Sequence, residues 1–257
     1  MNQPLPIGSI FSAALKLPLQ HTRKLVFLGL PLLGMLMLFD YFMPETLNFD
    51  TGISELILQA SIGVLTCLSL VIAVVGCHRL FLLENNQKPL FWSGNEFSYL
   101  IWWILMTIYM VLIMLPFVFL LIPLTGFLES SYSGLIEVVI VVLNIPLYYL
   151  ISRWSLLLPA VATGKRDVNI PWSWRLSKGN AWRLTLLIGL FPFTKEMIFA
   201  FVPETESLLF SFADNLLWLV IGVVEVGLLS LSYEFLIKNH QPEPETQGVD
   251  EAEPEQA

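Results

Sequence analysis

Long runs of apolar residues, separated by short polar segments, dominate this chain. An α-helix rises about 1.5 Å per residue, so about 20 apolar residues cross the roughly 30 Å hydrocarbon core of a bilayer. Several runs reach or approach that length. The pattern therefore predicts an all-α protein with six transmembrane helices, at residues 25–43, 56–77, 99–123, 135–153, 184–202 and 215–233.

Two of these runs depart from a simple crossing. Residues 97–128 contain no charged side chain and are longer than one crossing needs, so we expect the third helix either to be tilted or to continue from an interfacial turn. The fifth run is interrupted by Pro192, Lys195 and Glu196. A re-entrant or partly unwound segment is therefore an alternative to a full fifth crossing.

Three segments beside the spans have the pattern of amphipathic surface helices. Residues 6–24 repeat apolar positions at helical spacing, which predicts either an interfacial helix or a helix packed on the rest of the protein. The second starts at Ser93-x-x-Glu96, the spacing of a capping box, and runs into the third span. The third follows Asn169, with Pro171 in its first turn.

The basic residues predict the orientation of the spans. Of the thirteen Lys and Arg residues, twelve flank the same ends of the predicted spans, and Lys195 lies within a span. Because Lys and Arg favour cytoplasmic loops, we expect both termini in the cytoplasm. The net charge of −8 comes mainly from residues 241–257, which hold six acids and no base. We divide the chain into a transmembrane domain at 1–240 and a disordered acidic tail at 241–257.

Composition narrows the function classes. The chain is 56% hydrophobic with a mean hydropathy of +0.71, so lipid is the expected solvent for most of it. Its acidity argues against a nucleic-acid partner. Three scattered histidines offer no metal set, and no phosphate-binding loop or nucleophile motif occurs. We therefore expect no enzyme activity and no cofactor, with membrane lipids and other membrane proteins as candidate partners.

Three ionisable residues fall within the last two predicted spans. Lys195 and Glu196 lie in the fifth, and Glu225 lies in the sixth. Ionisable groups in lipid are costly and usually face a partner or a water-filled cavity. Two interpretations remain open: a polar site for an ion, a proton or a lipid headgroup, or an ion pair that stabilises the last hairpin.

Four basic residues are candidate contacts for lipid headgroups. Arg153 ends the fourth span, where its side chain can extend to lipid phosphates or pair with an acid of a neighbouring span. Arg175, Lys178 and Arg183 lie in the Trp-rich surface helix. Each base near an anionic leaflet contributes about 1 kcal/mol of attraction. Anchoring at the interface and specific headgroup recognition are the two interpretations.

Short similarities suggest an internal repeat. Gly94-Asn95 and Gly179-Asn180 each precede a predicted span and are each followed, after one residue, by an aromatic side chain. Three units of a surface helix and a transmembrane hairpin, beginning near residues 5, 88 and 168, would account for this pattern. Chance similarity among leucine-rich stretches is the alternative.

Three features carry a family resemblance. His78-Arg79 closes the second span, the sequence LLLPA follows shortly after Arg153, and Ala181-Trp182 lies in the helix that opens the fifth span. With these features the chain resembles a set of uncharacterised bacterial inner-membrane proteins that are distantly similar to the membrane domain of some glycerophosphodiester phosphodiesterases. The resemblance implies a location in the bacterial inner membrane and no assigned reaction, and it carries over no catalytic residue.

The sequence thus leaves two function classes. The first is a non-enzymatic accessory protein that organises lipids or partner proteins. The alternative is a transporter of a small molecule, an ion or a lipid, with its polar site at Lys195, Glu196 and Glu225. A polar, water-accessible cavity between the last two spans would favour transport, and apolar packing there would favour the accessory protein.

Overall fold

The structure is a computed structural model that describes residues 3–42, 52–83, 94–129, 133–191 and 207–240, with side chains described outside residues 120–143. Within these ranges all regular structure is helical and no strand occurs. The predicted acidic tail lies outside the described residues. The elements are α1 (Ile7–Gln20), α2 (Thr22–Phe42), α3 (Ile53–Leu82), α4 (Asn95–Glu129), α5 (Ser133–Trp154), α6 (Leu157–Ala162), α7 (Ile170–Leu176), α8 (Ala181–Leu184), the π-helix η1 (Thr185–Gly189) and α10 (Leu208–Asn239).

Among the described residues, five helical stretches are long and apolar enough to cross a membrane, and they indicate a membrane protein. They are Thr22–Phe42, Ile53–Leu82, Asn95–Phe119, Asn144–Ala162 and Leu208–Asn239. The prediction of an all-helical chain with long apolar helices is confirmed. The structure describes only residues 184–191 of the predicted fifth span. They include the last residue of α8 and the π-helix η1, and residues 192–202 lie outside the described part. A count of six spans stays a prediction.

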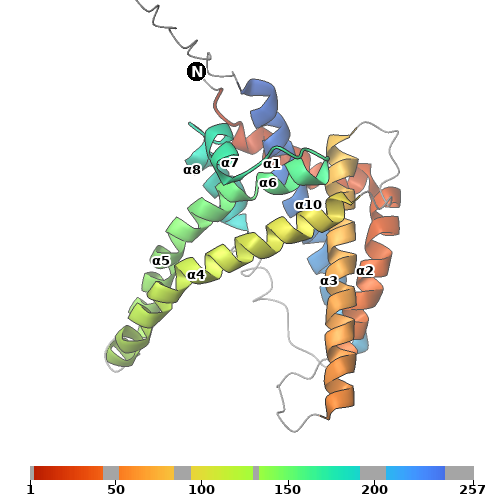
Figure 1. Ribbon diagram of the computed structural model, residues 1–257, viewed down its shortest axis with the longest axis vertical. Helices are drawn as coiled ribbons and strands as arrows, with labels where there is room; N and C mark the ends of the chain where they lie inside the picture. Colours follow the sequence, from red (N-terminus) through yellow and green to blue (C-terminus); the bar gives the residue numbers. More distant parts are fainter. Residues whose placement is uncertain (1–2, 43–51, 84–93, 130–132, 192–206, 241–257) are drawn as a thin grey trace, which may run out of the picture.

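The long helices form two groups (Figure 1). Helices α2, α3 and α10 pack against one another, and α1 packs on α10. Helices α4 and α5 form a hairpin that leans away from α3 toward the lower left of the view. The two groups approach each other at the upper end, where α6 contacts α3, α4 and α10. We call this the basic end, because Arg23 and Lys24 at the start of α2 and Arg79 near the end of α3 lie there.

The N-terminal helix α1 packs against the protein. It buries Ile10, Ala14 and Leu17, and a Cβ atom at Gly227 of α10 would lie only 2.7 Å from a methyl carbon of Leu17. A larger residue at this position of α10 would therefore require the Leu17 side chain to shift. The opposite face of α1 leaves apolar side chains such as Leu19 exposed. Of the two interpretations of residues 6–24, packing on the protein is therefore correct for one face of the helix.

The short helix α6 is the best buried element at the basic end. All six of its residues are buried, and the preceding Leu156 is inaccessible as well. This segment supplies the core against which α3, α4 and α10 pack.

A buried ion pair joins the two helix groups at α6. Arg79 of α3 donates from Nη1 to Glu96 Oε1 of α4 at 2.7 Å, and from Nε to the Ala162 carbonyl of α6 at 3.0 Å. Both charged side chains are buried. The sequence indicated Glu96 only as part of a capping box, and Ser93 lies outside the described residues. The structure thus gives Glu96 a second role that links distant elements.

Polar contacts also connect α10 to its neighbours. Near the basic end, His78 Nδ1 of α3 lies 2.8 Å from Ser230 Oγ. At the other end, Asp40 Oδ2 of α2 accepts hydrogen bonds from Ser211 Oγ at 2.7 Å and Asn215 Nδ2 at 2.6 Å. The group of α2, α3 and α10 is therefore fixed at both ends.

The two glycines of the suggested repeat share a backbone conformation. Gly94 has φ of 83° and Gly179 has φ of 84°, and a helix follows each. Such values favour glycine because a Cβ atom is strained there. This local similarity fits the suggested repeat, but the three-unit arrangement stays a prediction.

The buried ion pair predicts a large effect for Glu96→Gln. Removing the carboxylate leaves the Arg79 charge buried without its counterion, which should lower the free energy of unfolding by about 3–5 kcal/mol. Glu234→Gln is the matched control, because Glu234 pairs with Lys238 at an exposed site and should cost less than about 1 kcal/mol. Unfolding of the full chain in mixed micelles by titration with sodium dodecyl sulfate measures both. Equal stability of the two variants would contradict the linking role of the pair.

Candidate functional site

An elongated cavity of about 980 Å³ lies among the long helices. Its lining comes mainly from α2, α3 and α10, from the first half of α4, and from the end of α5 through the start of α6, with smaller contributions from α1 and η1. Ligand pockets in proteins typically occupy roughly 300–1,000 Å³, so the volume suits a sizeable small molecule. The cavity is therefore the candidate site.

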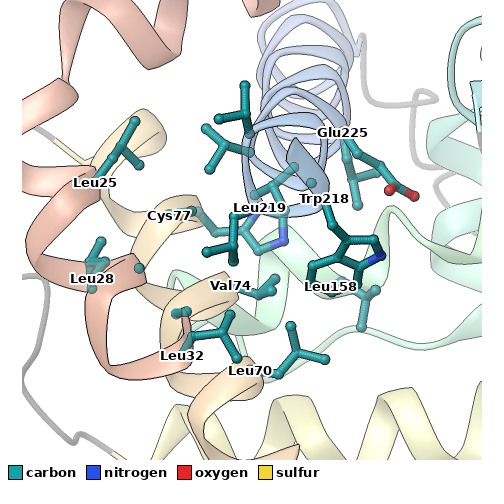
Figure 2. A pocket seen from close by; sticks show the side chains of 18 of the residues that line it. Leu25, Leu28, Leu32, Leu70, Val74, Cys77, Leu158, Trp218, Leu219 and Glu225 are labelled. Atoms are coloured by element: carbon teal, nitrogen blue, oxygen red, sulfur yellow. The ribbon is translucent and has the colours of Figure 1, made fainter. Parts of the chain in front are cut away.

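The walls of the cavity are mostly apolar (Figure 2). Leucines of α2, including Leu25, Leu28 and Leu32, lie on one side, with Leu70 and Val74 of α3 below the centre. Trp218, Leu158 and Glu225 lie on the opposite side. Such walls gain free energy from an apolar ligand, at about 25 cal/mol for each Å² removed from water. They offer little to a hydrated ion.

Glycines leave space for the cavity on two helices. A Cβ atom built at Gly29 of α2 or Gly222 of α10 meets no heavy atom within 4 Å, and both residues line the cavity. Gly34 of α2 is equally open but does not line it. Side chains added at Gly29 or Gly222 would therefore occupy the cavity itself.

The cavity has the length of a lipid chain. Along α10 its lining runs from Phe212 to Leu229, and along α2 from Thr22 to Leu33. At 1.5 Å per residue these stretches extend about 25 Å and about 16 Å. One leaflet contributes roughly half of a 30 Å hydrocarbon core. An extended acyl chain therefore fits along the cavity.

Of the three predicted intramembrane residues, the structure places one. Glu225 lines the cavity on α10 and interacts electrostatically with Tyr99 of α4. Lys195 and Glu196 lie outside the described residues, so both interpretations of the three-residue site stay predictions. The described lining includes no Lys or Arg. Within the described ranges, no three His, Cys, Asp or Glu side chains gather closely enough to hold a metal ion.

The sequence did not indicate His78 and Tyr99 as parts of a cavity. Both are buried, their rings lie 5.9 Å apart, and both line the cavity wall. A signal was available for His78, because a polar side chain in a long apolar helix needs a partner or a site. The partner itself, Ser230, could be identified only from the packing of α3 on α10.

Arg153 binds protein groups at the basic end. Its Nε donates to Ser177 Oγ at 2.8 Å, and its Nη2 donates to the Trp174 carbonyl at 2.7 Å. The guanidinium also lies 3.6 Å from the centre of the Trp174 ring, a cation–π contact. The side chain is buried. These contacts hold α7 against the end of α5, which neither of the two interpretations of Arg153 anticipated.

The other three candidate headgroup contacts are exposed. Arg175, Lys178 and Arg183 are all exposed, and so is Trp182, at 64%. Arg183 also donates from Nη1 to the Leu5 carbonyl at 3.1 Å, so it helps to hold the N-terminal segment. This surface combines positive charge with an exposed indole, as expected for contact with anionic headgroups.

In the part of the chain that the structure describes, the fold is all-helical, with five apolar helices of membrane-spanning length and an apolar cavity among them. Comparisons with protein-family models, with curated proteins and with solved structures found no match.

The exposed basic surface predicts a preference for anionic lipid. Replacing Arg175, Lys178 and Arg183 together by Gln should lower the anionic share of co-purifying phospholipid, because each charge contributes about 1 kcal/mol near an anionic leaflet. The measurement is mass spectrometry of lipids retained after extraction from vesicles of defined composition. Lys238→Gln, at an exposed ion pair, is the control. An unchanged lipid composition in the triple variant would show that these residues do not recognise headgroups.

Proposed function

We propose that the protein is a non-enzymatic membrane protein that binds a lipid chain in the cavity among α2, α3, α4 and α10. The observation that carries this proposal is the apolar lining of a cavity of about 980 Å³. Burial of an alkyl chain contributes about 0.8 kcal/mol for each CH₂ group. Holding lipid in this way is the activity of an accessory protein that organises lipids.

The open glycines support this proposal. Gly29 and Gly222 both line the cavity, and an added Cβ atom at either residue meets no heavy atom within 4 Å. A space of this size with apolar walls can accept an apolar occupant. In a bilayer the abundant apolar occupant is an acyl chain.

Transport of a small molecule or an ion is the second candidate. The carboxylate of Glu225 in the cavity wall is the observation that favours it. A cation in a dehydrated site needs several oxygen ligands, whereas the described lining is dominated by Leu, Val, Met and aromatic side chains. Lipid binding therefore accounts for more of the wall than ion transport does.

Photolabelling tests the proposal directly. The probe is a monoacylglycerol whose acyl chain carries a diazirine, incorporated into vesicles with the full-length protein. We expect saturable adducts on lining residues such as Val74 and Leu219. Labelling of Leu209, an exposed residue of α10 outside the cavity, should not saturate, because bulk lipid reaches it.

A cavity-filling variant supplies the matched comparison. Gly222→Phe should reduce the number of cavity adducts about tenfold, because the added ring occupies space in which a Cβ atom meets no other atom. The acyl chain then loses a contact area about the size of an aromatic ring, which costs at least about 1.4 kcal/mol of binding free energy. Gly34→Phe adds the same ring outside the cavity and should leave labelling unchanged. Equal labelling in both variants, or no saturable adducts in the parent protein, would refute lipid binding at this site.

A further inference from the structure

Two buried polar atoms of the cavity-lining residues have no partner among the described residues. They are Nε2 of His78 and Nε1 of Trp154. His78 is inaccessible and Trp154 is 8% exposed. A buried polar atom without a hydrogen bond costs about 1–3 kcal/mol, and such atoms are uncommon in native proteins. Their occurrence beside one cavity points to a ligand with a polar group.

The hydrogen bonds around His78 determine which kind of group it needs. Ser230 Oγ donates its single proton to the Val226 carbonyl at 2.7 Å. The Ser230 hydroxyl can therefore only accept a hydrogen bond from His78. Nδ1 of His78 is then the protonated nitrogen and donates across the 2.8 Å contact. In the neutral imidazole, Nε2 is then a bare acceptor. It requires a donor from the ligand.

A second residue of the wall supplies a donor. Nε1 of Trp154 lies in the same wall and can only donate. A group that can both donate and accept, such as a hydroxyl, matches these two residues.

We propose that the cavity selects a single-chain amphiphile with a hydroxyl group, which donates a hydrogen bond to His78 Nε2. This inference rests on the proposed function, because it names the class of lipid that occupies the cavity. The imidazole is fully covered, so lining side chains must move aside for the contact to form. Met106 and Met110 line the cavity, and the flexible thioether side chain adapts readily to such changes.

Competition against the photoreactive monoacylglycerol tests the choice of ligand. Hexadecanol can donate a hydrogen bond, hexadecyl methyl ether can only accept one, and hexadecanoate brings a negative charge. We expect hexadecanol to displace the probe from the cavity at about tenfold lower concentration than the ether. A tenfold difference corresponds to one hydrogen bond of about 1.4 kcal/mol. Hexadecanoate at a pH where it is ionised should compete least.

Variants connect this preference to His78. His78→Phe keeps a ring of similar size and removes the acceptor, so the alcohol and the ether should compete within about twofold of each other. Ser230→Ala retains His78 but removes the hydroxyl that keeps the imidazole proton on Nδ1. The preference for the alcohol over the ether should then fall to about threefold or less. Ser232→Ala, at a buried serine of α10 outside the cavity lining, should keep the full preference.

The outcomes separate the two proposals. Equal competition by the alcohol and the ether in the parent protein, with saturable labelling intact, would overturn the role of His78 and leave lipid binding standing. A preference that survives both His78→Phe and Ser230→Ala would also overturn it. Absence of saturable cavity labelling would refute the proposed function itself. If His78→Phe does not fold, Ser230→Ala and Ser232→Ala are compared instead. An equal preference for the alcohol in these two variants would overturn the role of His78.

Discussion

The ion pair between Arg79 and Glu96 is the contact on which the arrangement of the long helices depends. Together with the Ala162 carbonyl it joins α3, α4 and α6 at a buried point. Burial of two charges is costly unless their geometry and remaining hydrogen bonds compensate. The pair therefore specifies one way of joining the two helix groups. The two groups meet at this end and diverge from it (Figure 1), and the apolar cavity is lined by α2, α3 and α10 together with the first half of α4.

The long helices could be predicted from the sequence because each depends on a local pattern of apolar residues. The contacts among them could not, since they depend on packing. Glu96 fits a capping box when only its neighbours are considered, and its pairing with Arg79 requires α3 and α4 to meet. The apolar stretch in α6 resembles an interfacial segment by composition. It is buried because three longer helices pack around it.

In the candidate site, too, single residues could be predicted from the sequence but their partners could not. Glu225 could be predicted from the cost of an ionisable group in lipid, and it does line the cavity. The surrounding wall comes from residues scattered over several helices, which no single segment reveals. Arg153 could be identified as unusual, but its partners Ser177 and Trp174 lie on a helix whose position follows from tertiary packing. Sequence reasoning thus located unusual residues better than their partners.

The buried charge pair, the two helix groups and the proposed lipid chain in the apolar cavity can be tested together. A cryo-electron microscopy map of the full-length protein in a lipid nanodisc tests this link most directly. We expect elongated density along Val74, Leu219 and Gly222, with a polar end near His78, while Arg79 and Glu96 remain paired. A map in which α4 packs against α2 and α10 along its length and leaves no space between them would contradict the account.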